Sequence, residues 1–144
     1  MYNIADCGKA SAEIRSNRPS FFDARSLRVR MLEEANMTTT ELQAALGLEP
    51  LSLSGGTRVI TGWRVGDLLS HVLAHAKQGD AWITILASSN VIAVAQLADV
   101  ACVILAEGVE VSSQVIAQAK AHGVNLFRSG MPAHALCVAG VAGN

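Results

Sequence analysis

Residues 100–105, Val-Ala-Cys-Val-Ile-Leu, decide the fold class of this 144-residue chain. The run is continuously apolar, whereas a strand with one face in water would alternate apolar and polar side chains. A continuously apolar strand is covered on both faces, as in a parallel sheet between layers of helices. The run therefore predicts an α/β domain.

A regular alternation extends on both sides of this run. Apolar runs at 81–86, 100–106 and 124–127 alternate with helical patterns at 90–99, at 112–122 and from 131 onward. Strands joined by helices need crossover connections, which give parallel pairing. The alternation predicts a layered sheet with a mainly parallel βαβαβ core.

Two helices are expected before this core. The first begins at Thr38-Thr39-Thr40-Glu41, where a Thr hydroxyl can accept a free backbone N–H, and it ends at Gly47. The second covers about 67–78, with Asp67 suited to its N-cap.

Two short strands are expected between these helices, at 51–54 and 58–63. Ser54-Gly55-Gly56 separates them and has the composition of a turn. The sequence therefore predicts a hairpin-like pair that extends the sheet, with antiparallel pairing as one option.

Composition excludes several classes of protein. Charged residues are 16% and hydrophobic residues 51%, which excludes a disordered chain. The net charge of −1 gives no electrostatic footprint for nucleic acid or a membrane surface. No apolar run is long enough for a transmembrane helix, and no signal peptide is recognisable. Three cysteines without a CxxC pair are typical of a reducing compartment, so we expect a cytoplasmic protein.

The first 37 residues differ in composition from the rest. Residues 1–36 hold six of the eleven basic side chains and show no sustained apolar periodicity beyond a short possible helix over 24–35. We expect residues 1–37 to form a leader, either flexible or translated from a misassigned start, and 38–144 to form the compact domain.

Motifs for catalysis are missing from the sequence. The chain has no GxxxxGK[ST] loop, no GxGxxG fingerprint between a strand and a helix, and no GxSxG nucleophile elbow. We therefore expect no enzymatic activity and no catalytic residue.

The histidines leave one metal-dependent alternative open. His71 and His75 have the i, i+4 spacing that lets two imidazoles share a metal, but the Glu of HExxH is missing. Only His122 or Asp80 could add a third ligand. We favour two solvated histidines over a metal-dependent hydrolase. His134 and Cys137, at i, i+3, are treated with the same caution, and no metal site is predicted.

The predicted strand ends are the better candidates for a ligand site, because helix N-termini gather there and offer free N–H groups. Such a site would hold a phosphate or another anion. An ordinary helix cap by Ser89 or Asn90, with Arg128 in solvent, is the simpler interpretation. The candidate ligand residues are Ser88, Ser89, Asn90, Gly108 and Arg128.

The predicted helix 90–99 lacks a polar face. Residues 91–98 contain a single polar side chain, so the helix is either buried within the domain or covered by a second subunit. The final helical stretch is similarly apolar. We expect a homodimer, with candidate interface residues Val91, Val94, Ala95 and Leu136.

Three stretches carry a resemblance to a known family. Residues 61–70 (TGWRVGDLLS), 76–85 (AKQGDAWITI) and 90–95 (NVIAVA) resemble the DRTGG domain family, in particular its stand-alone bacterial members. The resemblance runs from about Thr39 to the C-terminus. This sequence departs from the family in two signature elements. Ala87-Ser88-Ser89 stands where the family has an acidic-basic pair, and Ala106-Glu107-Gly108 stands where the family has Thr-Gly-Gly.

The resemblance implies a fold similar to the N-terminal domain of HPr kinase/phosphorylase, without that enzyme's P-loop. It also implies a non-catalytic regulatory or dimerising module that acts on a partner protein, with a hydrogenase-linked redox system or a signalling kinase as the implied context. The alternative function is a sensor that binds an adenine nucleotide or another anionic small molecule at the strand ends. We expect no cofactor other than such a regulatory nucleotide.

Overall fold

The computed structural model describes residues 37–142. The predictions for the leader and for a helix over 24–35 therefore lie outside the described residues. The chain divides into two units, Met1–Glu33 and Glu34–Asn144, and everything described below belongs to the second.

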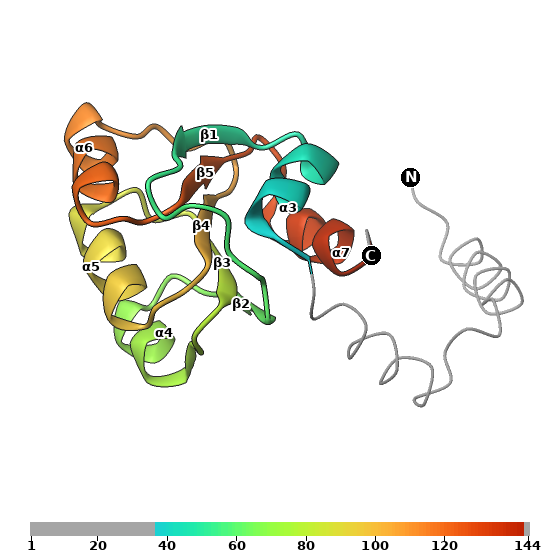
Figure 1. Cartoon of the computed structure of the whole chain (residues 1–144), viewed down its shortest axis with the longest axis horizontal. Helices are drawn as coiled ribbons and strands as arrows, with labels where there is room; N and C mark the ends of the chain where they lie inside the picture. The colour runs from blue at the N-terminus through green and yellow to red at the C-terminus, as the bar shows by residue number, and fades with distance from the viewer. Residues whose placement is uncertain (1–36, 143–144) are drawn as a thin grey trace, which may run out of the picture. The chain divides into compact units, whose positions relative to one another are not determined.

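The described residues form helices and strands in the order that the apolar pattern predicts (Figure 1). The elements are α3 (Thr39–Leu46), β1 (Glu49–Ser52), β2 (Gly62–Val65), α4 (Leu69–His75), β3 (Asp80–Thr84), α5 (Ser89–Leu97), β4 (Cys102–Leu105), α6 (Ser113–Ala121), β5 (Leu126–Arg128) and α7 (Ala133–Ala142).

The strands form one sheet in the order β1-β5-β4-β3-β2. Neighbours from β2 to β5 are parallel, and β1 pairs antiparallel with β5. The predicted α/β fold with a parallel core is confirmed. We call the side where the parallel strands begin the amino edge, and the side where they end the carboxyl edge.

Helices cover both faces of the sheet. In Figure 1, α4, α5 and α6 lie on one side of it, and α3 and α7 lie on the other. Alternate β4 side chains enter two separate cores: Val103 and Leu105 face α4–α6, whereas Cys102 and Ile104 face α3 and α7. The strand is continuously apolar because neither of its faces meets water.

Helix α3 begins and ends as the sequence predicts. The Thr38 hydroxyl accepts from Glu41 N–H, and the Glu41 carboxylate accepts from Thr38 N–H, which completes a capping box. The bonds that Thr38 N–H and Thr38 Oγ1 donate to the Glu41 carboxylate lower the pKa of Glu41, because they favour its ionised form. Gly47 ends the helix in the left-handed conformation, at φ 60°.

The expected hairpin between 51–54 and 58–63 is wrong. β1 and β2 lie at opposite edges of the sheet, and neither pairs with the other. Residues 53–61 do not turn back at Gly55-Gly56. They cross the amino edge instead, and we call them the crossing segment.

Asn125, which is 2% exposed, holds the crossing segment at the start of β5. Its Oδ1 accepts from Gly55 N–H at 3.1 Å, and its Nδ2 donates to the carbonyls of Gly56 and Ala101 at 2.9 and 3.1 Å. A Cβ on Gly55 would lie 2.8 Å from the Gly123 carbonyl oxygen, so this close approach requires glycine. A buried side chain therefore replaces the hairpin's backbone pairing.

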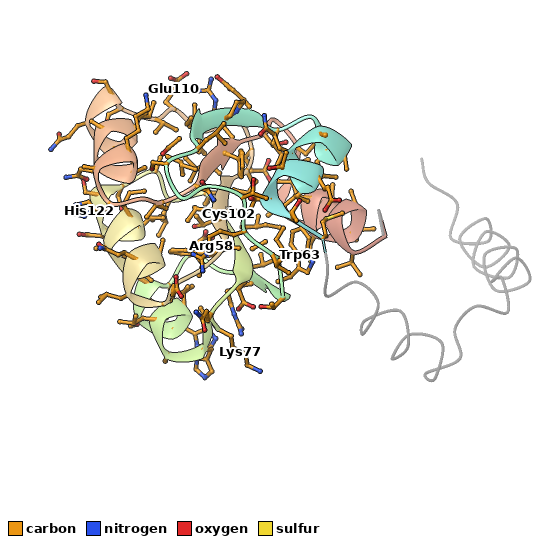
Figure 2. All side chains as sticks on the ribbon, viewed as in Figure 1. Arg58, Trp63, Lys77, Cys102, Glu110 and His122 are labelled. Carbon is orange, nitrogen blue, oxygen red and sulfur yellow. The ribbon has the colours of Figure 1, made fainter. Side chains whose placement is uncertain are left out.

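Arg58 holds the middle of the crossing segment (Figure 2). Its guanidinium donates to the carbonyls of Val100 and Asp99 at 2.7 and 3.2 Å and pairs with the Asp99 carboxylate at 2.9 Å. Thr61 N–H then donates to the Gly79 carbonyl at 2.9 Å, just before β3. The segment thus contacts the beginnings of β5, β4 and β3 in turn.

Candidate functional site

The carboxyl edge carries all five residues that the sequence analysis assigned to an anionic ligand. Loops leave this edge after each parallel strand, at 66–68, 85–88, 106–112 and 129–132. Ser88, Ser89 and Asn90 start α5, Gly108 follows β4, and Arg128 ends β5.

The α5 residues are the most accessible of the candidates. Ser88 is the N-cap residue, but its side chain makes no cap hydrogen bond. Ser88 and Ser89 are half-buried and Asn90 is exposed. The simpler interpretation, in which one of these side chains caps α5, is therefore not observed at the N-cap position.

The loop after β4 is tied to the loop after β5. Glu107 and Gly108 both have left-handed backbones, at φ 60° and 62°. Gly108 N–H donates to the Ser129 carbonyl at 2.9 Å, and Glu107 N–H donates to the Met131 carbonyl at 3.0 Å. The Glu107 carboxylate accepts from Ala133 N–H at 3.3 Å, which places its charge at the start of α7. The N–H of Gly108 is thus already engaged.

Arg128 is engaged as well. Its Nε and a terminal nitrogen donate to the two carboxylate oxygens of Glu49 at 2.8 and 3.0 Å. This bidentate pair raises the pKa of Arg128, and the nearby charge of Glu110 acts in the same direction. Glu49 stands opposite Arg128 across the β1–β5 pair. The strand that precedes Ser88 is β3, two positions away in the sheet. The five candidates therefore form two groups along one edge.

Asp67 has a role that its place in the sequence does not reveal. It was expected to cap the second helix, but α4 begins at Leu69 with Leu68 in the N-cap position and no side-chain cap. Asp67 Oδ1 instead accepts from Thr84 Oγ1 at 2.8 Å and from Ile85 N–H at 3.0 Å. The carboxylate joins the loop after β2 to the end of β3.

Three large apolar residues lie next to this junction in the chain or in the sheet, and their side chains are open to solvent. Val65 is 48% exposed, Leu68 68% and Ile85 44%. Leu68 follows Asp67, Ile85 is hydrogen-bonded to it, and Val65 ends the adjacent edge strand. We call these three residues the apolar corner. An apolar cluster exposed at a sheet edge is typical of a contact surface.

The charge at the carboxyl edge is predominantly negative. Glu49, Asp67, Glu107 and Glu110 all lie at strand ends or in the loops that follow them. In those described segments Arg128 is the only Lys or Arg. The helix N-termini offset part of this charge. The edge as a whole is better suited to apolar or basic groups than to a phosphate.

The proposed dimer residues lie inside the domain. Val91 and Leu136 are 1% and 0% exposed, and Val94 and Ala95 are also buried. Helix α5 packs between α4 and α6, which explains why it has so little polar surface. A side chain covered by its own chain has no surface left for a partner, so an interface would need other residues.

The histidines do not form a larger metal cluster. Residues 37–142 contain no group of three or more His, Cys, Asp or Glu side chains able to hold a metal. Asp80 is buried, with its carboxylate accepting from Lys77 N–H, and Figure 2 shows His122 apart from Lys77, which follows α4. Neither of the suggested third ligands joins His71 and His75.

One further hollow lies away from the carboxyl edge. It measures about 160 Å³ and is lined by residues of α3 and the crossing segment and by Phe127. Its other walls include Thr39, Thr40 and Thr57. The hydroxyls of Thr40 and Thr57 bond to each other across it, at 3.1 Å.

Comparison with known proteins identifies the fold. No protein-family model matches the chain, and no curated protein matches it. A crystal structure of the CBS and DRTGG domains of the regulatory region of Clostridium perfringens pyrophosphatase, complexed with the activator diadenosine tetraphosphate, matches with a TM-score of 0.63 at 14% identity. The match covers 91% of this chain and 55% of that one, so the chain spans about half its length. The chain shares its α/β fold with a nucleotide-bound regulatory region.

Within residues 37–142 every helix is too short or too polar to cross a bilayer.

Proposed function

We propose that this chain is a non-catalytic regulatory module of the DRTGG type, which works in the cytoplasm as a homodimer and acts on a partner protein. The implied context for that partner is a hydrogenase-linked redox system or a signalling kinase. The fold that the chain shares with a regulatory region supports this proposal.

The apolar corner is the observation that carries the proposal. Val65, Leu68 and Ile85 expose large side chains beside β2, which lies at the edge of the sheet that residues 37–142 form and pairs there with β3. Burying such side chains against a protein surface is favourable, at about 25 cal/mol per Å² of apolar area. We assign the dimer contact to this corner, because the earlier candidates are in the core.

Light scattering and two charge substitutions test the dimer. We expect the wild type to be a dimer and Val65→Lys to be a soluble, folded monomer. A lysine at this exposed position is solvated in the monomer, but its charge opposes burial in an apolar contact. Val91→Lys is the matched control and should unfold the protein, since it buries an unpaired charge. A monomeric wild type, or a Val65→Lys variant that stays dimeric, contradicts this assignment.

A sensor for an adenine nucleotide or another anionic small molecule is the second candidate. One observation favours it: the N-cap of α5 has no side-chain bond, which leaves Ser88 able to contact a ligand. Asn90 is exposed beside it. Against it, Arg128 is neutralised by Glu49, and further carboxylates line the same edge.

Calorimetry and thermal unfolding with AMP, ADP, ATP and dinucleotides separate the two candidates. A ligand at a hundredfold excess over its Kd stabilises the folded state by about 2.7 kcal/mol. The regulatory module that binds only protein should show no heat of binding and no shift in Tm. A shift that disappears in Arg128→Ala would favour the sensor instead.

A further inference from the structure

We propose that His71 and His75 form a two-imidazole chelating site on the outer face of α4 for a borderline divalent transition metal ion such as Ni²⁺, Cu²⁺ or Zn²⁺. The site is independent of the carboxyl edge and of the proposed regulatory function. It is a surface site with two protein ligands, and water completes the coordination.

The two rings are already together. They stack with centroids 4.2 Å apart and an interplanar angle of 28°. Both histidines are exposed, and neither belongs to an ion pair among the described residues. One helical turn separates them, so ordering the site costs less than bringing together distant parts of the chain.

One ring is also oriented for coordination. His75 Nδ1 lies 2.9 Å from the carbonyl oxygen of His71. A carbonyl oxygen only accepts, so Nδ1 is the donor and carries the hydrogen. The lone pair of His75 is then on Nε2, the ring nitrogen that is not bonded to the helix backbone. Metal-binding histidines almost always donate from the second ring nitrogen in this way, to a carboxylate, a backbone carbonyl or water.

Coordination requires only a small rearrangement. In the stack the two ring planes are inclined by 28°, whereas a shared ion needs both lone pairs to converge on it at about 2.0–2.1 Å. Rotation about χ2 of an exposed histidine has a broad, shallow energy profile and takes place within nanoseconds. The hydrogen bond of His75 limits the movement of that ring, so His71 makes the larger rotation.

The donor set determines the class of metal. Imidazole nitrogens suit Zn²⁺, Cu²⁺ and Ni²⁺, whereas Mg²⁺ and Ca²⁺ need oxygen ligands. No carboxylate joins the pair, since residues 37–142 contain no cluster of three potential ligands. The site therefore discriminates against Mg²⁺ by chemistry, and its open positions make it a docking point rather than a closed structural centre.

The experiment is a titration of the full chain with Ni²⁺ by calorimetry, with Mg²⁺ as the reference ion. We expect Ni²⁺ binding that weakens about tenfold or more in His71→Ala and in His75→Ala, because losing a ligand costs at least as much as losing its outer partner. His122→Ala and His134→Ala are matched controls and should bind like the wild type.

A spectroscopic measurement keeps the result independent of stability. Substoichiometric Cu²⁺ should broaden the imidazole NMR signals of His71 and His75 before those of the other histidines. Circular dichroism verifies that each variant is folded. Unchanged Ni²⁺ affinity in His71→Ala, an equal loss in His122→Ala, or broadening that begins at His122 or His134 overturns the proposal.

Discussion

The two edges of the sheet are built in opposite ways. At the amino edge the polar groups bond to backbone: the buried Asn125 and the half-buried Arg58 fasten the crossing segment to the beginnings of three strands. At the carboxyl edge Asp67 and Glu107 also make bonds, but they are exposed and leave large apolar side chains such as Leu68 uncovered.

The difference distinguishes polar residues that stabilise the fold from polar residues that are free to bind a partner. A buried amide with three hydrogen bonds is costly to remove, because its buried partners would be left without a hydrogen bond from either protein or water. An exposed polar group at a loop can be exchanged at little cost to stability and is therefore free to serve binding. Polar residues at the amino edge should thus determine stability, and those at the carboxyl edge should determine interaction.

Substitution of Asn125 should give the largest effect. Asn125→Ala leaves the N–H of Gly55 and the carbonyls of Gly56 and Ala101 unpaired, so we expect the free energy of unfolding to fall by about 3 kcal/mol. Urea denaturation measures this loss. The matched control at the other edge, Asn90→Ala, should change it by less than about 0.5 kcal/mol. Similar losses in both variants would remove the contrast between the edges.

Alkaline pH should reveal how tightly the amino edge is closed. Burial raises the pKa of the Cys102 thiol from 9.0 to about 12, although the charge of Arg58 opposes the shift. The folded state therefore keeps a proton that the unfolded state loses above about pH 9. This contribution is fully present below pH 9 and disappears as the pH rises toward 12.

When the folded state binds one proton more than the unfolded state, the free energy of unfolding falls by about 1.4 kcal/mol per pH unit. It should therefore fall by about 2 kcal/mol by about pH 10.5. Urea titrations across this range measure the slope. Cys102→Ala should show a flatter alkaline slope than the wild type, since lysines and the tyrosine titrate in both proteins. Equal slopes would mean that water reaches the thiol.

A comparison of two arginines should give the smallest difference. Arg58→Ala removes bonds to the carbonyls of Val100 and Asp99, and we expect it to lower the free energy of unfolding by about 1.5 kcal/mol. Arg128→Ala removes a pair with Glu49 that is about as exposed as the Arg58–Asp99 pair but removes no bond to a backbone carbonyl of residues 37–142, so it should cost less. Thermal unfolding of both variants tests the order, and the reverse order would contradict it.

Sequence patterns predicted those parts of the fold that depend on local chemistry. Thr38 and Gly47 mark the ends of α3, because a capping hydroxyl and a left-handed glycine act within one turn of the helix. The run from Val100 to Leu105 predicted a strand covered on both faces, because the absence of polar side chains is readable from the run itself.

Local sequence patterns could not predict which strands pair with each other or what covers the apolar sides of a helix. The glycines at 55 and 56 favour a hairpin by local rules, but the pairing partner depends on Asn125, seventy residues later. In the same way, Val91 and Val94 show only that α5 has little contact with water. Whether neighbouring helices or a second subunit cover them depends on the tertiary arrangement, and α4 and α6 do so here.

The sequence predicted where the candidate ligand residues lie but not which bonds they already make. The strand-end rule placed Ser88, Gly108 and Arg128 at one edge, as the structure has them. It could not show that Glu49, 79 residues before Arg128, already neutralises the guanidinium. Asp67 followed a common capping pattern and therefore gave no signal of its bond to Thr84.

The position of β1 has a consequence for how the chain folds. Among the strands of residues 37–142 it pairs with β5, and its Glu49 is bonded to a residue 79 positions later. Likewise α3 packs beside α7, the last helix. During synthesis β1 and α3 therefore wait for β5 and α7 before their apolar sides are covered, while β2 to β4 can assemble through local crossovers. We expect closure of the β1–β5 pair to be the late step, and the interval before it to be the one in which a chaperone is most useful.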